Sequence, residues 1–158
     1  MNRETIKGRW SIQSWEQLYD DGRVVCPMGT ELEGFIEYSD FGMFCVVAKK
    51  GRELFLTGGQ WSAEDAEKAA AYSSYLTYAG DFDVAGNTIT HKVRYSIFPN
   101  WVGGNQLRTA ELNGDTLSLT ARLEEGSSEA RTARLMWTRA TVRSEEHTSE
   151  LQSHSDLV

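Results

Sequence analysis

Four side chains that could hold a polar molecule or move a proton lie close together in the second half of the chain. They are two tyrosines, a histidine and an arginine: Tyr78, His91, Tyr95 and Arg108. A histidine exchanges a proton near neutral pH, and an arginine stabilises a negatively charged oxygen. Alternation of apolar and polar side chains predicts that all four face inward from three adjacent strands. The sequence therefore predicts a mostly apolar pocket in which a few polar groups converge.

The inward orientation of these side chains follows from the predicted strand over residues 88–98, in which every second residue lies on the same face. Ile89 marks its apolar side, and His91 and Tyr95 share that side. The strand before it is joined through a turn at Gly86, and shifting that turn by one residue keeps Tyr78 on the His91 side. The prediction for these side chains is thus insensitive to the details of the turn.

Arg108 is placed by the next hairpin. A two-residue turn at Asn113-Gly114 predicts that Arg108 lies opposite Leu119, with Gln106 on the same inward face. A buried arginine is costly unless it is paired, so Arg108 is expected to need a carboxylate, backbone carbonyls or a ligand.

The role of His91 remains open among three hypotheses. It could be a core histidine that is hydrogen-bonded to a tyrosine or to the backbone. It could orient a polar ligand group or transfer a proton. It could also be an axial haem ligand, but no second feature of the sequence supports that role. No cofactor and no metal is therefore expected, and no cluster of residues has metal-ligand spacing.

The remaining elements predict one all-β domain over residues 1–142. Turn signals separate short β-rich runs, and one alanine-rich helix, capped by Ser62, is expected to end near Tyr72. This pattern is typical of an antiparallel up-and-down β-barrel of about 8–10 strands with one short helix. The predicted strands span residues 9–19, 34–38, 43–48, 53–57, 78–84, 88–98, 106–112, 116–123 and 131–140.

Residues 143–158 are excluded from this prediction. The run from Arg143 to Ser153 resembles a translated sequencing adapter, codon for codon, so we interpret the tail as non-native and expect it to be disordered. Without it the chain has 15 basic and 19 acidic side chains, a net charge of −4, and His91 is its one histidine.

Composition and charge restrict the partners and the compartment. A mildly acidic domain without a basic stripe argues against nucleic acid and anionic membrane as partners. The first residues lack the apolar run of a signal peptide, and Cys26 and Cys45 are too few for a disulfide framework. A cytoplasmic protein with two free thiols is the expectation.

Motifs along almost all of residues 6–140 resemble the bacterial and fungal lipocalin-like domain family, small barrels of the calycin type. The resemblance implies an antiparallel barrel with a cavity for an apolar ligand, and it implies that Arg139 stacks on Trp10 to close the barrel floor. The matching motifs are Gly8-Arg9-Trp10, residues 34–38, Tyr78-Ala79-Gly80, His91, Pro99-Asn100-Trp101-Val102-Gly103, Arg108, Leu117-Ser118-Leu119 and Trp137-Thr138-Arg139.

The resulting hypothesis is a binding protein for a small, largely apolar metabolite. Inward side chains would hold the polar end of the ligand, and a loop tryptophan would cover the barrel mouth. The alternative is an enzyme on the same barrel, a cyclase or isomerase of polyketide- or terpenoid-like substrates with His91 as general acid/base and Arg108 and Tyr95 assisting. The candidate ligand-binding residues are Tyr78, His91, Tyr95, Trp101, Gln106 and Arg108.

Overall fold

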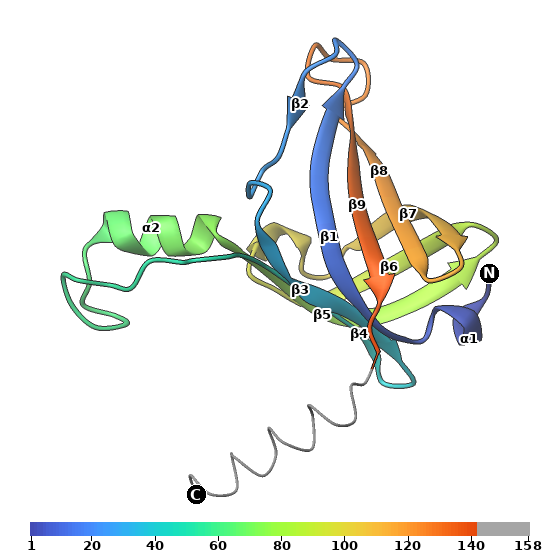
Figure 1. Ribbon diagram of the computed structural model, residues 1–158, viewed down its shortest axis with the longest axis horizontal. Coiled ribbons are helices and arrows are strands. Elements are labelled where there is room, and N and C mark those ends of the chain that lie inside the picture. Colours follow the sequence, from blue (N-terminus) through green and yellow to red (C-terminus); the bar gives the residue numbers. More distant parts are fainter. Residues whose placement is uncertain (142–158) are drawn as a thin grey trace, which may run out of the picture.

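A computed structural model describes residues 1–141 of the chain, and these residues form an antiparallel β-structure with little helix (Figure 1). The two α-helices are α1 (Arg3–Ile6) and α2 (Asp65–Ser73), and a 3-10 turn, η1, spans Pro99–Trp101. The strands are β1 (Gly8–Tyr19), β2 (Val24–Val25), β3 (Leu32–Ser39), β4 (Gly42–Lys49), β5 (Tyr75–Ala85), β6 (Thr88–Ser96), β7 (Asn105–Asn113), β8 (Thr116–Leu123) and β9 (Arg131–Arg139).

Eight of these strands close into a barrel, which confirms the predicted fold. Each strand pairs with its sequence neighbour from β3 to β9, β1 pairs with β3, and the pairing of β1 with β9 completes the ring. The ninth strand, β2, forms a short additional pairing with β1 near Tyr19. Tight hairpins connect several neighbours, and Gly42, Gly86 and Gly114 adopt the positive φ that such turns favour.

One end of the barrel is closed by aromatic packing and by the N-terminal segment. Trp10 and Trp137 are buried there, and the guanidinium of Arg139 lies 4.1 Å from the ring centre of Trp10. Arg139 also donates hydrogen bonds to the carbonyls of Lys7 and Thr5, which fixes the chain that leads out of α1. The predicted stacking of Arg139 on Trp10 is confirmed, and it defines the floor of the barrel.

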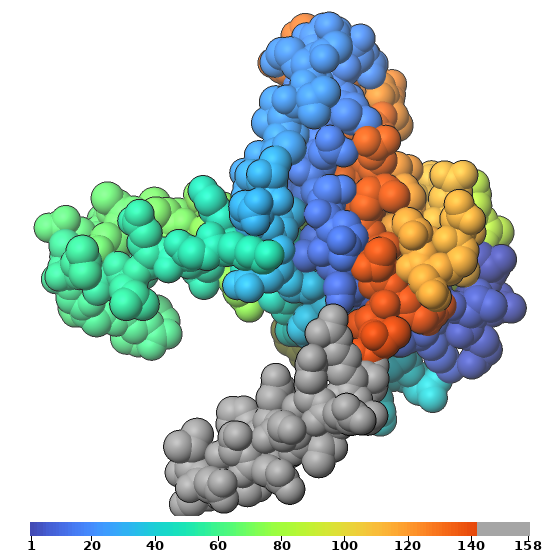
Figure 2. All heavy atoms as spheres, viewed as in Figure 1, coloured from blue at the N-terminus to red at the C-terminus, as the bar shows by residue number. Residues whose placement is uncertain are grey.

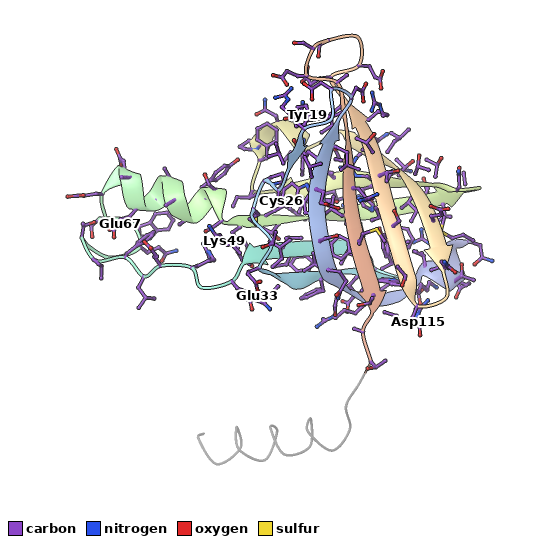
Figure 3. The ribbon with its side chains drawn as sticks, turned by 45° about the horizontal axis from the view of Figure 1, so that its top comes forward. Tyr19, Cys26, Glu33, Lys49, Glu67 and Asp115 are labelled. Carbon is purple, nitrogen blue, oxygen red and sulfur yellow. The ribbon has the colours of Figure 1, made fainter. Side chains whose placement is uncertain are left out.

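The opposite end is the mouth. Antiparallel order brings four connections together there, at residues 20–31, 50–74, 97–104 and 124–130. In Figure 3, Tyr19 lies at the mouth end of β1 and Asp115 lies at the floor end of the β8 hairpin. On β1, β8 and β9 most inward side chains nearer the floor are buried, whereas those nearer the mouth are only partly buried. The partly buried inward residues include Trp15, Gln17, Ala121, Ala133 and Leu135.

The connection between β4 and β5 forms an arm that stands away from the barrel (Figures 1 and 2). It carries α2, which begins at Asp65 and has no buried side chain. The predicted strand over residues 53–57 is wrong: β4 and β5 pair directly with each other, which leaves this segment no strand to join. The backbone N–H groups of Leu56 and Thr57 instead donate to the carboxylate of Glu67. Lys49 lies at the base of the arm, and Glu67 lies on its helix (Figure 3).

Two smaller predictions about turns and caps are also wrong. Ser62 does not cap α2, because its hydroxyl accepts a hydrogen bond from the N–H of Gly59 and the N-cap position belongs to Glu64. The β7–β8 turn lies one residue later than predicted, so that Ala110 pairs with Leu119. That register differs from the prediction by two residues, and a shift of two preserves the face on which every side chain lies.

The described residues also bear on membrane-spanning segments and on the state of the two cysteines. No helix within residues 1–141 is both long enough and apolar enough to cross a membrane. Cys26 and Cys45 are free thiols, the first partly buried and the second buried. Residues 143–158 lie outside the described residues, so their interpretation as a non-native tail stays a prediction.

Candidate ligand-binding site

His91 occupies the centre of the candidate site. It lies on β6, opposite Phe82 of β5 on one side and opposite Gln106 of β7 on the other, and its side chain has no exposed surface. The Nε2 atom of His91 is 2.7 Å from the Tyr38 hydroxyl oxygen, and the Nδ1 atom is 3.0 Å from that of Tyr78. Both ring nitrogens are therefore hydrogen-bonded, and three side chains from three strands form one buried network.

The imidazole in this network is neutral. Burial lowers the pKa of His91 to about 3, and the positive charge of Arg108 acts in the same direction. A neutral imidazole has one donor and one acceptor nitrogen, so one tyrosine hydroxyl donates to His91 and the other accepts from it. The accepting hydroxyl still has its own proton. If Tyr38 is the accepting hydroxyl, its O–H group is available to a third acceptor, whereas the O–H group of Tyr78 can donate to the neighbouring sulfur of Cys45.

Cys45 lies next to Tyr78 across the β4–β5 pairing. Burial raises the pKa of the Cys45 thiol to about 12, although its hydrogen bond with Tyr78 acts in the opposite direction. Burial also raises the pKa of the Tyr78 hydroxyl and that of Tyr38. All these groups are uncharged at neutral pH, so Arg108 is the charged neighbour in their environment.

Arg108 faces inward from β7, as predicted. It lies directly opposite the buried Ile89, and Gln106 lies directly opposite His91, so both share the inward face. The guanidinium donates to the carbonyl of Leu107 and, over 3.2 Å, to the side-chain oxygen of Gln106. Within residues 1–141 it forms no ion pair with a carboxylate, and the arginine is only partly buried. Its charge therefore lacks a counterion.

The predicted inward orientation of Tyr95 is wrong. A bulge in the β5–β6 pairing puts Gly80 opposite Val93 but Ala79 opposite Tyr95, which reverses the parity of the strand beyond it. Tyr95 consequently points outward and is 72% exposed. A Cβ atom at Gly80 would lie 1.9 Å from the carbonyl oxygen of Lys92, so the close backbone approach here requires glycine.

Trp101 lies beside Tyr78 at the mouth. It belongs to η1, whose proline at the start fixes the local backbone. Its ring makes an edge contact with Tyr78, with 5.4 Å between ring centres, and a second edge contact with Phe98. The tryptophan is partly buried against the core. This places an aromatic side chain between the His91 network and the opening, where the sequence predicted a cover.

The structure adds two inward residues that sequence reasoning missed. Tyr38 completes the hydrogen-bond network, and its parity with the buried Ile36 on β3 was a signal that could have found it. Trp137 is 1% exposed, and its indole N–H has no hydrogen-bond partner among the described residues. A buried donor without an acceptor is uncommon.

Two hollows lie outside the barrel interior. One, of about 440 Å³, lies within the arm between residues 49–55 and α2, and its charged groups are held by contacts in the arm, such as that of Arg52 with Ser74. The other, of about 360 Å³, lies on the outer face beside Phe44 and Tyr95. Tyr78 also lines this second hollow, but neither hollow is lined by His91, Tyr38 or Arg108, so we base the candidate site on the converging polar groups.

Comparison with known proteins agrees with this architecture. A family model described as a lipocalin-like domain matches residues 7–140. The chain belongs to this family, which confirms the resemblance inferred from the sequence motifs. No solved structure matches the chain.

One curated relative is a carrier protein of Aspergillus oryzae. It is named the 4'-hydroxy-3'-methoxypropiophenone carrier protein ppsC and is 36% identical over 67 residues. The aligned region covers 37% of this chain and 60% of the relative, so the chain spans less than two thirds of the length of that protein.

Proposed function

We propose that this protein binds a small, largely apolar molecule inside the barrel, through the mouth. The observation that carries the proposal is the gradient of burial along the inward faces of β8 and β9. Leu117 and Trp137, nearer the floor, are buried, whereas Ala121, Ala133 and Leu135, nearer the mouth, remain partly accessible. An apolar wall is the usual lining of a small-molecule site.

The polar end of the ligand would lie at the junction of these two zones. Arg108 and Gln106 lie on the inward face of β7, and Gln106 lies directly opposite His91 of the Tyr38–His91–Tyr78 network. Trp101 would then cover the aromatic or aliphatic body of the ligand. A small number of polar groups in a mostly apolar lining is enough to orient a ligand, and it keeps the cost of removing water from the site low.

The geometry favours binding over the alternative of acid–base catalysis. Both nitrogens of His91 are engaged by tyrosines, and with a pKa of about 3 the imidazole is a weak base. A general base works best when its pKa lies near the operating pH. The outward orientation of Tyr95 also removes one of the groups that the catalytic hypothesis required. The same engaged nitrogens argue against axial haem ligation.

The relative named above is described as a carrier of an aryl ketone, which is a small apolar molecule with polar oxygens. For this chain we propose only that it carries a small molecule, because the alignment covers part of each protein. An aryl ketone of this size is also a convenient first probe for binding.

The test blocks the lumen without removing any polar group. Ala121 and Ala133 face each other across the inner surface of β8 and β9. Replacing Ala121 by Phe should fill this space and weaken the binding of 4'-hydroxy-3'-methoxypropiophenone to the full chain by at least about 10-fold, which corresponds to about 1.4 kcal/mol. Binding is measured from quenching of tryptophan fluorescence and by native mass spectrometry.

Thr120→Phe provides the matched control, because Thr120 precedes Ala121 on β8 and faces outward. It adds an aromatic ring of the same size to the outer surface of the barrel. Equal loss of binding in both variants, or undiminished binding in a folded Ala121→Phe variant, would contradict a ligand site in the lumen.

A further inference from the structure

The charged residues of the barrel strands are distributed unequally between its two faces. The six strand carboxylates all lie on the outer face, alternating with inward residues, and several form ion pairs there, such as Arg9 with Glu37 and Lys92 with Asp83. The inward face of the strands carries arginines and no carboxylate within residues 1–141. The outward acids are Glu16, Glu33, Glu37, Asp81, Asp83 and Glu111.

The inward arginines differ in how they are held. Arg139 stacks on Trp10 at the floor, and Arg131 near the mouth donates to the side chain of Gln17 and lies over the ring of Tyr19. Arg108 has only the carbonyl of its own neighbour and the amide oxygen of Gln106, both uncharged acceptors. Among the inward arginines, Arg108 is therefore the one whose positive charge is least balanced by neighbouring groups.

The other polar atoms available inside the barrel are also donors. The orientation of the network in which Tyr38 accepts from His91 leaves the O–H group of Tyr38 without an assigned acceptor. The indole N–H of Trp137, deeper in the barrel, has no partner among the residues that the structure describes. An arginine without a carboxylate partner, on an inward face that also carries unused donors, is complementary to a negatively charged oxygen.

We propose that the ligand is a small apolar molecule with one anionic oxygen at its end, and that Arg108 is the residue that selects this charge. This inference rests on the lumen site proposed above. The shared chemistry is a single oxyanion, which can be the phenolate of a phenol acidified by an acyl group or a carboxylate on an aromatic body. A neutral molecule would leave the charge of Arg108 without a counterion, whereas an anion supplies one.

The phenolate form can be followed by its own absorbance. The phenol of 4'-hydroxy-3'-methoxypropiophenone loses its proton to solvent as the pH rises, and its spectrum reports the fraction ionised. With saturating full-chain protein, the pKa of the bound phenol should fall below that of the free compound, because Arg108 stabilises the anion. A bound pKa that is unchanged or raised would overturn the proposal, because burial without a cation disfavours the charged form.

The protein groups that face this site do not titrate in the same range. His91 has a pKa of about 3 and Cys45 one of about 12, and burial raises the pKa of both Tyr38 and Tyr78. Arg108 provides the positive charge at the site. A change in the spectrum of the probe near neutral pH therefore reports the ligand itself.

Neutral compounds of the same shape distinguish a phenolate ligand from a carboxylate ligand. The methyl ether 3',4'-dimethoxypropiophenone cannot ionise, and it should bind about 10- to 100-fold more weakly than the phenolate. In a second pair, 4-propylbenzoate should bind about 10- to 100-fold more tightly than 4-propylbenzyl alcohol if a carboxylate is accepted. Preference in one pair alone identifies that oxyanion as the ligand type.

Two variants test the role of Arg108. Arg108→Gln should weaken the binding of the anions by about 10- to 100-fold and leave the neutral compounds almost unaffected, whereas Arg108→Lys, which keeps the charge, should retain most of the preference. The matched control is Arg94→Gln, because Arg94 lies on the outer face of β6 and pairs with Asp81. It makes the same change in net charge far from the lumen.

The possible results separate this inference from the function on which it rests. If neutral and anionic compounds bind equally well in the wild-type protein, the charge selectivity is wrong and the lumen site stands. If Arg94→Gln weakens anion binding as much as Arg108→Gln does, the effect is general electrostatics and the inference is also wrong. If none of the compounds binds, both the site and its charge preference are refuted.

Discussion

Acid should destabilise this protein through His91 before most carboxylates are protonated. His91 is neutral in the folded protein with a pKa of about 3, compared with 6.5 for an unperturbed histidine. Between these two values the unfolded chain binds one more proton at this residue than the folded chain does. The free energy of unfolding therefore falls as the pH falls through 6.5, and this loss is complete near the folded pKa.

The magnitude follows from the difference between the two proton affinities. Lowering the pH from 7 to 5 should reduce the free energy of unfolding by about 2 kcal/mol through this one residue. Exposed carboxylates such as Asp20 and Asp83 have folded pKa values below their usual range, so their contribution is lost mainly below pH 5. The chosen interval thus isolates the histidine.

The assay is equilibrium unfolding in urea at both pH values, followed by tryptophan fluorescence. The variant His91→Gln should be less stable than the wild type at pH 7, by about 1–3 kcal/mol, because buried tyrosine hydroxyls lose a partner. Its stability should nevertheless change little between pH 7 and pH 5. His147 and His154 are present in both proteins, so their contribution cancels in the comparison. An equal loss of stability in both proteins would refute the neutral, buried histidine.

Three further predictions concern the framework and its thiols. Arg139→Ala should lower the free energy of unfolding by about 1–3 kcal/mol, since it removes the stacking on Trp10 and two hydrogen bonds to carbonyls; ligand affinity, measured by fluorescence quenching, should remain within about twofold of wild type. Gly80→Ala should destabilise the protein by on the order of 3 kcal/mol or more, because the new Cβ would meet a carbonyl of the neighbouring strand, and thermal unfolding followed by circular dichroism measures this effect. With a thiol-reactive dye at pH 8, Cys26 should react quickly, whereas Cys45, with a pKa of about 12, should react only as fast as the barrel opens. Rapid labelling of both thiols in the folded protein would contradict the buried position of Cys45.

The sequence was sufficient to predict the barrel because its signals are local and repeated. Alternation along β8 and turn residues such as those near Gly86 and Gly114 specify short antiparallel hairpins without reference to distant parts of the chain. The predicted inward face of Arg108 is correct although the turn was predicted one residue too early. The resulting register error is two residues, and side chains alternate between faces with a period of two. His91 and Gln106 were placed correctly for the same reason.

Other features could not be read from the sequence, because they depend on contacts between distant segments. The bulge at Gly80 reverses the face of Tyr95, and nothing within residues 88–98 shows that an extra residue enters the pairing. The segment over residues 53–57 has the composition of a strand, yet it has no edge to pair with because β4 and β5 join each other. Local preference predicts a strand only where tertiary structure provides a neighbour.

The sequence by itself determined the class of fold and the inward position of His91, Gln106 and Arg108, since these depend on local patterns and strand parity. The Trp10–Arg139 closure was implied by the family resemblance. Only the tertiary structure decided the chemistry of the site. It brought Tyr38 and Tyr78, 40 residues apart in the chain, onto the two nitrogens of one histidine. It also left Arg108 facing inward without a carboxylate among the described residues. The state of a buried group is set by its spatial neighbours and by exclusion of water, and these are properties of the packed barrel.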